Sequence, residues 1–390
     1  MPNKMWAMKL PPFLLERWMT RHETNVQFDI AESGILPLST NDLLDFEAPA
    51  ERAATVDRLL AIPLGYSEAR GTAALRQMLA DTYERATADN ILVTTGAIEA
   101  NYLLYNVLLD AGDHVIAPHP AYQQLYEVPR SIGCDVSLWE VGPQTNYRYD
   151  VEALKRLITP KTKLIVVNTP HNPTGAMLSP AEAAEVYSLA AKVGAMVIGD
   201  EAYRWLDVPG GEPFAGPMFD RGANGISVGT LSKPFGLPGL RIGWIACSPE
   251  LVEKCWSLRD YITLSPGKLN DALGCLGLKH RAAIVARNTK IIEANLKSAA
   301  RWIGERPYLS WTPPRGGLLA LIKYDPSVIN VPSFELADRL AIEQSVMLAP
   351  GAAFGYEHHL RLGIGQRPDI FSEGLRRAGV LLESIVRVGR

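Results

Sequence analysis

The chain has 390 residues, of which 47% are hydrophobic and 21% are charged, and its formal net charge is −3. This length favours two domains, and the weak charge gives no electrostatic reason to expect nucleic acid or an anionic membrane as a partner. The four cysteines are scattered and form no CxxC pair, which argues against a disulfide framework and a zinc site. We therefore expect free thiols in a reducing, cytoplasmic compartment, and we expect no bound metal.

The N-terminal stretch is predicted to be an arm rather than a targeting segment. Pro11 and Pro12 interrupt it before the apolar core of a signal peptide could form, and no run elsewhere approaches the ~20 apolar residues of a membrane span. Residues 1 to about 35 form this arm, with a short helix at residues 13–19 and a turn at Gly34.

Two carboxylates of the arm are candidate substrate contacts. Glu16 and Glu23 could meet a cationic group of a substrate if the arm covers a substrate pocket. A solvated helix face is the competing interpretation, and the sequence leaves both open.

From residue 65 to residue 246, apolar strands alternate with amphipathic helices, which predicts a parallel sheet covered on both faces. Strands are predicted at residues 91–94, 114–117, 134–139, 163–168, 195–199, 226–228 and 242–246. Helices are predicted at residues 72–86, 98–110, 151–158 and 180–193.

A turn of small residues, Thr95-Gly96-Ala97, lies between the first of these strands and the following helix. Free backbone N–H groups and the positive end of the helix dipole favour a phosphate at such a place. Gly96 and Ala97 therefore belong to a predicted anion cradle.

Three later loops place polar or aromatic side chains after apolar strands. Tyr122 could lie over a flat ring. Asn172 stands in the loop HNPTG, whose prolines hold it stiffly enough to aim a side chain. Asp200 ends a strand, where an aspartate can also be only a helix cap.

Lys233 lies in the segment TLSKPFGLPGLRIGW, residues 230–244, between two strands that hold it on a rigid frame. The glycines of this segment allow a ligand or a second backbone to come close, and Arg241 offers a planar fork of donors suited to a phosphate. A desolvated lysine beside an arginine is expected to lose its proton easily, and it can form a Schiff base with a carbonyl. A surface loop beside an ordinary glycine turn is the alternative.

The last part of the chain is predicted to form a small α+β domain. Arg361 projects from the strand LRLG, where in isolation it could be a surface arginine. A helix at residues 251–263 and a long helical pattern from 268 to about 306 lead into this domain. Its strands are predicted at residues 318–322, 346–348 and 360–364, and its helices at 334–342 and 370–386.

Together, the lysine segment and the HNPTG loop resemble the motifs of class I/II aminotransferases, the aspartate aminotransferase superfamily of fold type I. The family usually has serine or glycine where this chain has Thr230, and threonine keeps the hydroxyl. The resemblance implies an α/β fold with a mostly parallel seven-stranded sheet in a large domain and a small α+β domain. It also implies pyridoxal 5'-phosphate as cofactor and a homodimer. The implied division is an arm with part of the small domain at residues 1–45, a cofactor-binding large domain at 46–285 and the C-terminal small domain at 286–390.

The resemblance implies a role for each candidate residue. Lys233 would form the Schiff base and act as general base, Asp200 would pair with the ring nitrogen, and Arg361 would hold the substrate α-carboxylate. The other implied cofactor contacts are Gly96, Ala97, Thr230, Ser232 and Arg241 around the phosphate, Tyr122 on the ring, Asn172 and Tyr203 at the ring oxygen, and Tyr66 from the partner subunit. The other implied substrate contacts are Gly34, Asn172 and Glu16.

Within the family, the arm FLLERWM and the run LRDYITL look most like a branch that includes capreomycidine synthase, a cyclase of an arginine-derived amino acid. Two outcomes follow: transfer of the amino group of an α-amino acid to a 2-keto acid, or elimination and cyclisation of a hydroxyarginine-like substrate. Transamination is placed first because it is the commoner outcome for this set of residues. A third hypothesis is a non-catalytic regulator that binds pyridoxal phosphate. Such regulators carry an additional basic winged-helix segment, and the sequence before the arm is too short to hold one.

Overall fold

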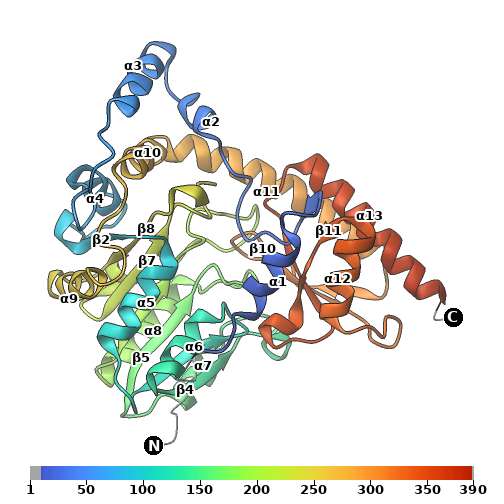
Figure 1. Cartoon of the computed structure of the whole chain (residues 1–390). Coiled ribbons are helices and arrows are strands. Elements are labelled where there is room, and N and C mark those ends of the chain that lie inside the picture. Colours follow the sequence, from blue (N-terminus) through green and yellow to red (C-terminus); the bar gives the residue numbers. More distant parts are fainter. Residues whose placement is uncertain (1–9, 389–390) are drawn as a thin grey trace, which may run out of the picture.

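A computed structural model describes residues 10–388, so residues 1–9 of the predicted arm lie outside the described residues. The chain folds into a large part around a seven-stranded sheet and a small part around a four-stranded sheet (Figure 1). In Figure 1 the small part lies to the right, and helix α3 projects from the body at the upper left.

The large sheet has the strand order β2-β8-β7-β6-β5-β3-β4. β8 runs antiparallel to both of its neighbours, and the pairs from β7 through β6, β5 and β3 to β4 are parallel. The expected mostly parallel seven-stranded sheet is therefore confirmed. Its strands are β2 (Ile91–Thr94), β3 (His114–His119), β4 (Asp135–Glu140), β5 (Thr162–Asn168), β6 (Met196–Asp200), β7 (Gly225–Thr230) and β8 (Gly243–Ala246).

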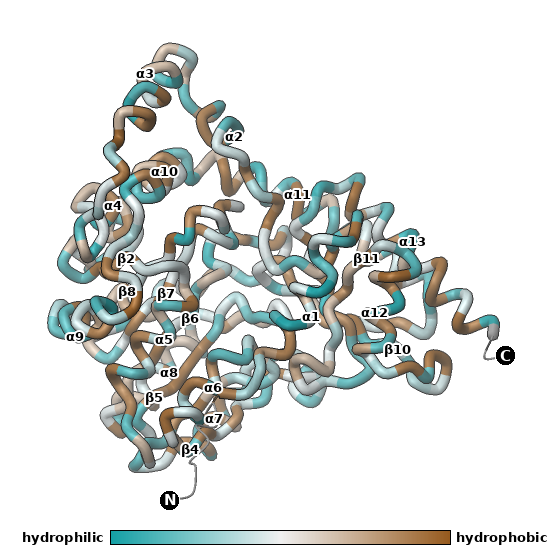
Figure 2. Tube along the Cα trace, viewed as in Figure 1, coloured by the Kyte–Doolittle hydropathy of each residue, from teal (hydrophilic) through white to brown (hydrophobic). Residues whose placement is uncertain are grey.

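Helices cover both faces of this sheet, which is why its central strands are apolar almost throughout (Figure 2). Successive strand residues point to opposite faces. Val166 packs under α5 (Ala97–Leu108), α6 (Gln124–Ile132) and α9 (Pro249–Arg259). Val167 packs under α7 (Val151–Leu157) and α8 (Pro180–Lys192). Val93, on strand β2 at one end of the strand order, packs under α4 (Ala73–Ala80) and α10 (Lys268–Lys279).

Several helix boundaries differ from the sequence prediction for identifiable reasons. The predicted helix from residue 268 to about 306 is wrong as a single element, because the chain breaks at His280 between α10 and α11 (Arg281–Gly304). His280 Nε2 lies 3.0 Å from Glu47 Oε1, which holds the break against the start of α3 (Pro49–Leu60). Helices α2 (Thr40–Leu44), α3 and α6 were not predicted, and α6 contains Pro129.

The small part combines the C-terminal region with the arm. Strand β1 (Phe28–Asp29) pairs in parallel with β11 (Val346–Met347), and helix α1 (Leu14–His22) is anchored by Trp18, whose Nε1 donates to Asp338 Oδ1 at 2.7 Å. The four-stranded antiparallel sheet has the order β12-β13-β10-β9. Its elements are β9 (Leu309–Trp311), β10 (Leu319–Tyr324), β12 (Ala349–Pro350) and β13 (His359–Gly363), with helices α12 (Ser333–Gln344) and α13 (Pro368–Val388).

Within residues 10–388, no helix is both long enough and apolar enough to cross a membrane.

Gly243 allows a close backbone approach in the large sheet, and its replacement gives a first prediction. A Cβ there would lie 2.3 Å from the carbonyl carbon of Gly96 and 2.5 Å from the Ala97 nitrogen, which are backbone atoms that cannot move aside. We expect Gly243→Ala to destabilise the fold by about 1–3 kcal/mol. Thermal and denaturant unfolding measure this loss. Gly239→Ala is the matched control, since a Cβ there meets nothing within 4 Å, and equal stability of the two variants would contradict the prediction.

Candidate active site

The carboxyl ends of the parallel strands meet at one edge of the large sheet, and polar residues follow several of them. Asn168 at the end of β5 pairs with Asp200 at the end of β6, and Asp200 pairs with Val228 of β7. The loop that follows β7 carries Lys233. A cavity of about 420 Å³ opens at this edge, where ligands bind in open α/β sheets. Its lining includes these predicted residues: Glu16, Gly96, Ala97, Tyr122, Asn172, Asp200, Tyr203, Thr230, Ser232, Lys233, Arg241 and Arg361.

Arg241 and the N-terminus of α5 form one end of the cavity. Thr94 pairs with Gly243, so the turn after β2 and the residues before β8 lie at the same edge. Gly96 has a φ of 80°, and a Cβ there would lie 2.6 Å from Arg241 Nη2, so only glycine fits. Arg241 Nη1 donates to the Pro238 carbonyl at 3.0 Å, which fixes the guanidinium beside the helix start.

Thr230 shapes the loop that carries Lys233. Its hydroxyl donates to the Ile242 carbonyl at 2.8 Å and accepts from the Ser232 N–H at 3.1 Å. The threonine hydroxyl therefore serves the loop itself, and both residues also line the cavity.

Asp200 is a buried carboxylate at the cavity wall, with only 5% of its surface exposed. Its oxygens accept from Asn101 Nδ2 at 2.9 Å and from the Ala202 N–H at 3.2 Å. Burial raises the pKa of Asp200, and these two neutral donors only partly oppose it. A cation on the cavity side would keep this carboxylate ionised.

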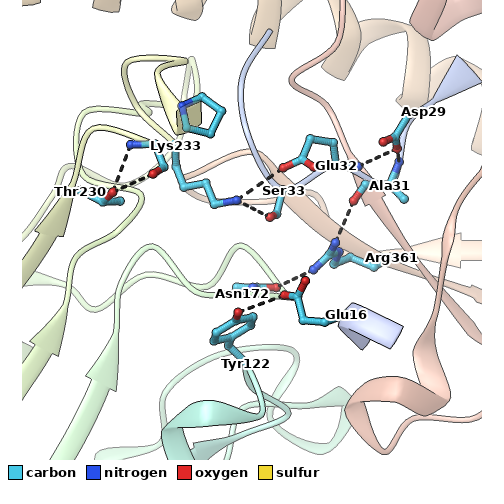
Figure 3. Close-up of polar contacts among 12 residues, drawn as sticks. Glu16, Asp29, Ala31, Glu32, Ser33, Tyr122, Asn172, Thr230, Lys233 and Arg361 are labelled. Carbon is cyan, nitrogen blue, oxygen red and sulfur yellow. Dashed lines mark hydrogen bonds and ion pairs between the residues drawn. The ribbon is translucent and has the colours of Figure 1, made fainter. Parts of the chain in front are cut away.

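Asn172 and Arg361 meet across the two sheets (Figure 3). Arg361 Nη1 donates to Asn172 Oδ1 at 3.2 Å, and Nη2 donates to the Ala31 carbonyl at 2.8 Å. Arg361 is 1% exposed, its Nε has no partner, and no carboxylate of residues 10–388 lies within 4 Å of its nitrogens. A buried guanidinium in this state calls for an anion from the cavity.

Lys233 points into the cavity, but its protonation differs from the expectation. Its Nζ donates to Ser33 Oγ at 2.8 Å and lies 3.4 Å from Glu32 Oε1 (Figure 3). Burial lowers the pKa of Lys233, but Glu32 and Tyr203 raise it, and the resulting pKa lies above the ordinary value. The prediction that the free lysine loses its proton easily is therefore wrong.

The two tyrosines of the cavity differ in their surroundings. Tyr203 is 4% exposed, and burial raises the pKa of its hydroxyl. Tyr122 packs on Phe13, with ring centroids 4.7 Å apart, and its hydroxyl donates to Glu16 Oε1 at 3.0 Å. The arm thus touches the predicted ring-stacking residue directly.

Two predicted residues are not brought to the cavity. Gly34 is not part of its wall, which Glu32 and Ser33 form instead. Tyr66 is 82% exposed on a loop near Gly267 and does not line the cavity of its own chain. The roles given to both stay predictions.

Sequence reasoning missed the cavity residues Glu32, Ser33 and Asn101. Asn101 lies one helical turn after Ala97 in α5, so the predicted cradle could have indicated it. Glu32 and Ser33 precede the predicted turn at Gly34, but nothing local shows that this turn folds against β13.

The side chains around the cavity fit pyridoxal 5'-phosphate. Arg241 and the free N–H groups of α5 suit a phosphate, because both present donors and positive charge. Asp200 has only neutral donors and suits a protonated ring nitrogen. The side-chain oxygen of Asn172 accepts a hydrogen bond from Arg361. Its NH2 group has no partner among the described residues, so it is available to donate to a ring oxygen. No group of three or more His, Cys, Asp or Glu side chains in the described part of the chain could hold a metal ion.

Comparison with known proteins gives the family. The sequence model of aminotransferase class I and II matches residues 33–370. Capreomycidine synthase of Streptomyces vinaceus is 29% identical over 93% of this chain and 91% of its own length. Arginine–pyruvate transaminase AruH of Pseudomonas aeruginosa is 31% identical over 88% of each chain. The crystal structure of the PLP-dependent cyclase OrfR superposes with a TM-score of 0.87 at 30% identity, covering 98% of this chain and 100% of that one.

The chain therefore belongs to the aminotransferase class I and II family, and it is an enzyme that uses pyridoxal phosphate. The fold expected from the sequence is that of its relatives.

Replacement of Asp200 tests its predicted role at the ring nitrogen. We expect Asp200→Asn to keep the cofactor through the Arg241 end of the cavity but to lose orders of magnitude in kcat, because an amide does not stabilise a protonated nitrogen. Steady-state rates and a cofactor-binding titration separate the two effects. A fall in kcat of less than about tenfold, which is ~1.4 kcal/mol, would show that Asp200 is not the partner of this nitrogen.

Proposed function

We propose that the protein transfers the α-amino group of an amino acid to a 2-keto acid. The main support is that the Lys233 amine, the Asp200 carboxylate and the Arg361 guanidinium lie around one cavity. Arg361 has no carboxylate partner among the described residues. This is the set that the reaction needs: a base, a stabiliser of positive charge on a ring, and a binder for the α-carboxylate.

Each side chain has a task that follows from its surroundings. Bound pyridoxal phosphate supplies an aldehyde for the amino group and an electron-withdrawing ring. Arg361 binds the α-carboxylate by a two-pronged ion pair and so orients the α-carbon. Lys233 takes the proton from the α-carbon, and Asp200 keeps a proton at the ring nitrogen. Tyr203 lines the cavity, and its hydroxyl would donate a hydrogen bond to the ring oxygen.

The preferred substrate of this proposal carries a cationic side chain of the arginine type. Glu16 on α1 and Glu23 just after its end both line the cavity, and α1 packs on the small part through Trp18. Carboxylates placed there suit a guanidinium. A relative of similar length is named for its action on arginine and pyruvate, which supports the same substrate class.

Cyclisation is the second candidate, favoured by one specific observation. The structure with a TM-score of 0.87 is that of a PLP-dependent cyclase, and it covers 98% of this chain. The same cavity residues serve both outcomes, because both begin with removal of the α-proton.

A substrate screen separates the candidates. We expect arginine to convert the cofactor to its amine form, with turnover only when a 2-keto acid such as pyruvate is added. If 3- or 4-hydroxyarginine gives a cyclic product and returns the aldehyde form without any keto acid, the cyclase stands and the transaminase falls. Tight cofactor binding with no exchange of any amino acid's α-proton would instead identify the non-catalytic regulator.

The same assay tests the substrate class. Glu16→Gln and Glu23→Gln are expected to raise KM for arginine about tenfold or more, because each loses a charged hydrogen bond, and to leave KM for alanine unchanged. Equal effects on both amino acids would place these carboxylates outside side-chain recognition.

The homodimer is also part of this proposal. Four apolar side chains are each at least 80% exposed: Leu60 at the end of α3, Leu64 and Tyr66 on the segment after it, and Tyr261 on the loop after α9. Tyr66 forms a β-bridge with Gly267, so the two apolar segments lie side by side. Exposed apolar surface of this kind marks an interface. The four free cysteines support the expected cytoplasmic location.

Light scattering and cofactor titration test the dimer. We expect twice the mass of one chain, and Tyr66→Phe should weaken cofactor binding about tenfold because one hydrogen bond to a charged phosphate is lost. Tyr261→Phe is the matched control, because Tyr261 is equally exposed but has no predicted cofactor contact. A monomer with full activity would contradict the proposal.

A further inference from the structure

The carboxylate of Glu32 stands beside the Lys233 amine, and no sequence motif accounts for it. Nζ lies 3.4 Å from Glu32 Oε1 and 2.8 Å from Ser33 Oγ, as Figure 3 shows. Both partners come from the arm, while Lys233 belongs to the loop after β7. The lysine is therefore held by a segment about 200 residues away in the sequence.

The loop that carries Glu32 is fixed on both sides. Asp29 Oδ1 accepts from the N–H groups of Ala31 at 2.9 Å and of Glu32 at 3.0 Å. Arg361 Nη2 donates to the Ala31 carbonyl, and a Cβ at Gly363 would lie 2.0 Å from the Glu32 carbonyl oxygen. A backbone packed this closely against β13 aims the carboxylate at one place.

Several other charged or titratable groups surround Lys233. Glu32 and Tyr203 favour its charged form and Arg361 disfavours it. Glu32 is the one carboxylate of the described residues in ion-pair distance of Nζ. Lys233 in turn is the largest influence that lowers the pKa of Glu32. The further groups at this cavity are Glu16 on α1, Glu23 just after α1, Tyr122 after β3, Asp200 on β6 and Arg241 before β8. Asp29 on β1 lies close to Glu32, and its Oδ1 is held by the backbone N–H groups of Ala31 and Glu32.

We propose that Glu32 is the counter-ion of Lys233, a carboxylate that stabilises positive charge on the lysine nitrogen during the reaction. The proposal rests on the assignment of Lys233 as the cofactor-bound lysine. When Lys233 takes the α-proton, one proton moves from the α-carbon to Nζ, and Glu32 takes none. The ammonium that results is stabilised by Glu32 at the moment it forms, which favours proton removal over the reverse step.

A spectroscopic titration tests this without turnover. The absorption of the cofactor joined to Lys233 changes when the joined nitrogen loses its proton, so its midpoint measures the charge preference of that nitrogen. An opposite charge at this distance shifts a pKa by about 1 or more. We expect Glu32→Gln to lower the midpoint by about 1 or more, and Glu32→Asp, which keeps the charge, to lower it less.

Glu23→Gln is the matched control, because Glu23 lines the same cavity without contact to Lys233. A midpoint of Glu32→Gln equal to that of Glu23→Gln would overturn the inference. A raised KM for arginine with an unshifted midpoint would do the same, and would assign Glu32 to the substrate side chain. Near-ultraviolet circular dichroism of each variant verifies that the site has folded.

The failure of this inference is distinguishable from failure of the proposed function. Lys233→Ala should lack the absorption of the lysine-bound cofactor, whereas Lys254→Ala, on the exposed side of α9, should keep it. If Lys233→Ala keeps the absorption, the lysine assignment falls and the Glu32 proposal falls with it. If Lys233→Ala loses it and Glu32→Gln leaves the midpoint unshifted, the Glu32 proposal alone falls.

Discussion

The buried guanidinium of Arg361 joins three segments that lie far apart in the sequence. It belongs to β13 of the small sheet, it donates to Asn172 on the loop after β5, and it donates to Ala31 of the arm. A buried cation with no carboxylate in ion-pair distance is costly, and the described residues offer Arg361 none. An anion bound in the cavity beside Arg361 would therefore stabilise the site. A substrate α-carboxylate bound there would also fix the arm and the two sheets relative to one another.

The large sheet could be predicted because a strand buried on both faces must be apolar along its whole length. Residues 163–168 show this pattern and form β5 with one further residue, Thr162. The pattern fails where burial is partial. Helix α3 buries little more than Thr55, so its sequence has no clear apolar periodicity. Helix α6 contains Pro129, a residue that argues against a helix in the sequence. The break at His280 depends on a contact with Glu47 that lies outside any local pattern.

The site residues differ in the same way. Asn172, Asp200 and Lys233 could be predicted because each follows a strand of one sheet, and the carboxyl ends of parallel strands meet. The charge of Lys233 could not be predicted, because it depends on Glu32 at a distance of 201 residues in the sequence. Local sequence shows which residues end a strand, but it does not show which distant loop folds over them.

The balance of charge explains why such a carboxylate belongs in this cavity. In the proposed function a phosphate beside Arg241 and an α-carboxylate beside Arg361 would neutralise both guanidinium groups. In the same function Lys233 has no such source of negative charge, because it would react with a neutral carbonyl and then take a proton. A protein carboxylate beside the nitrogen would stabilise the positive charge that it gains. In the proposed function Asp200 serves the ring nitrogen, and Glu16 is hydrogen-bonded to Tyr122. Among the described residues this leaves Glu32, which lies in ion-pair distance of Nζ, to stabilise that charge.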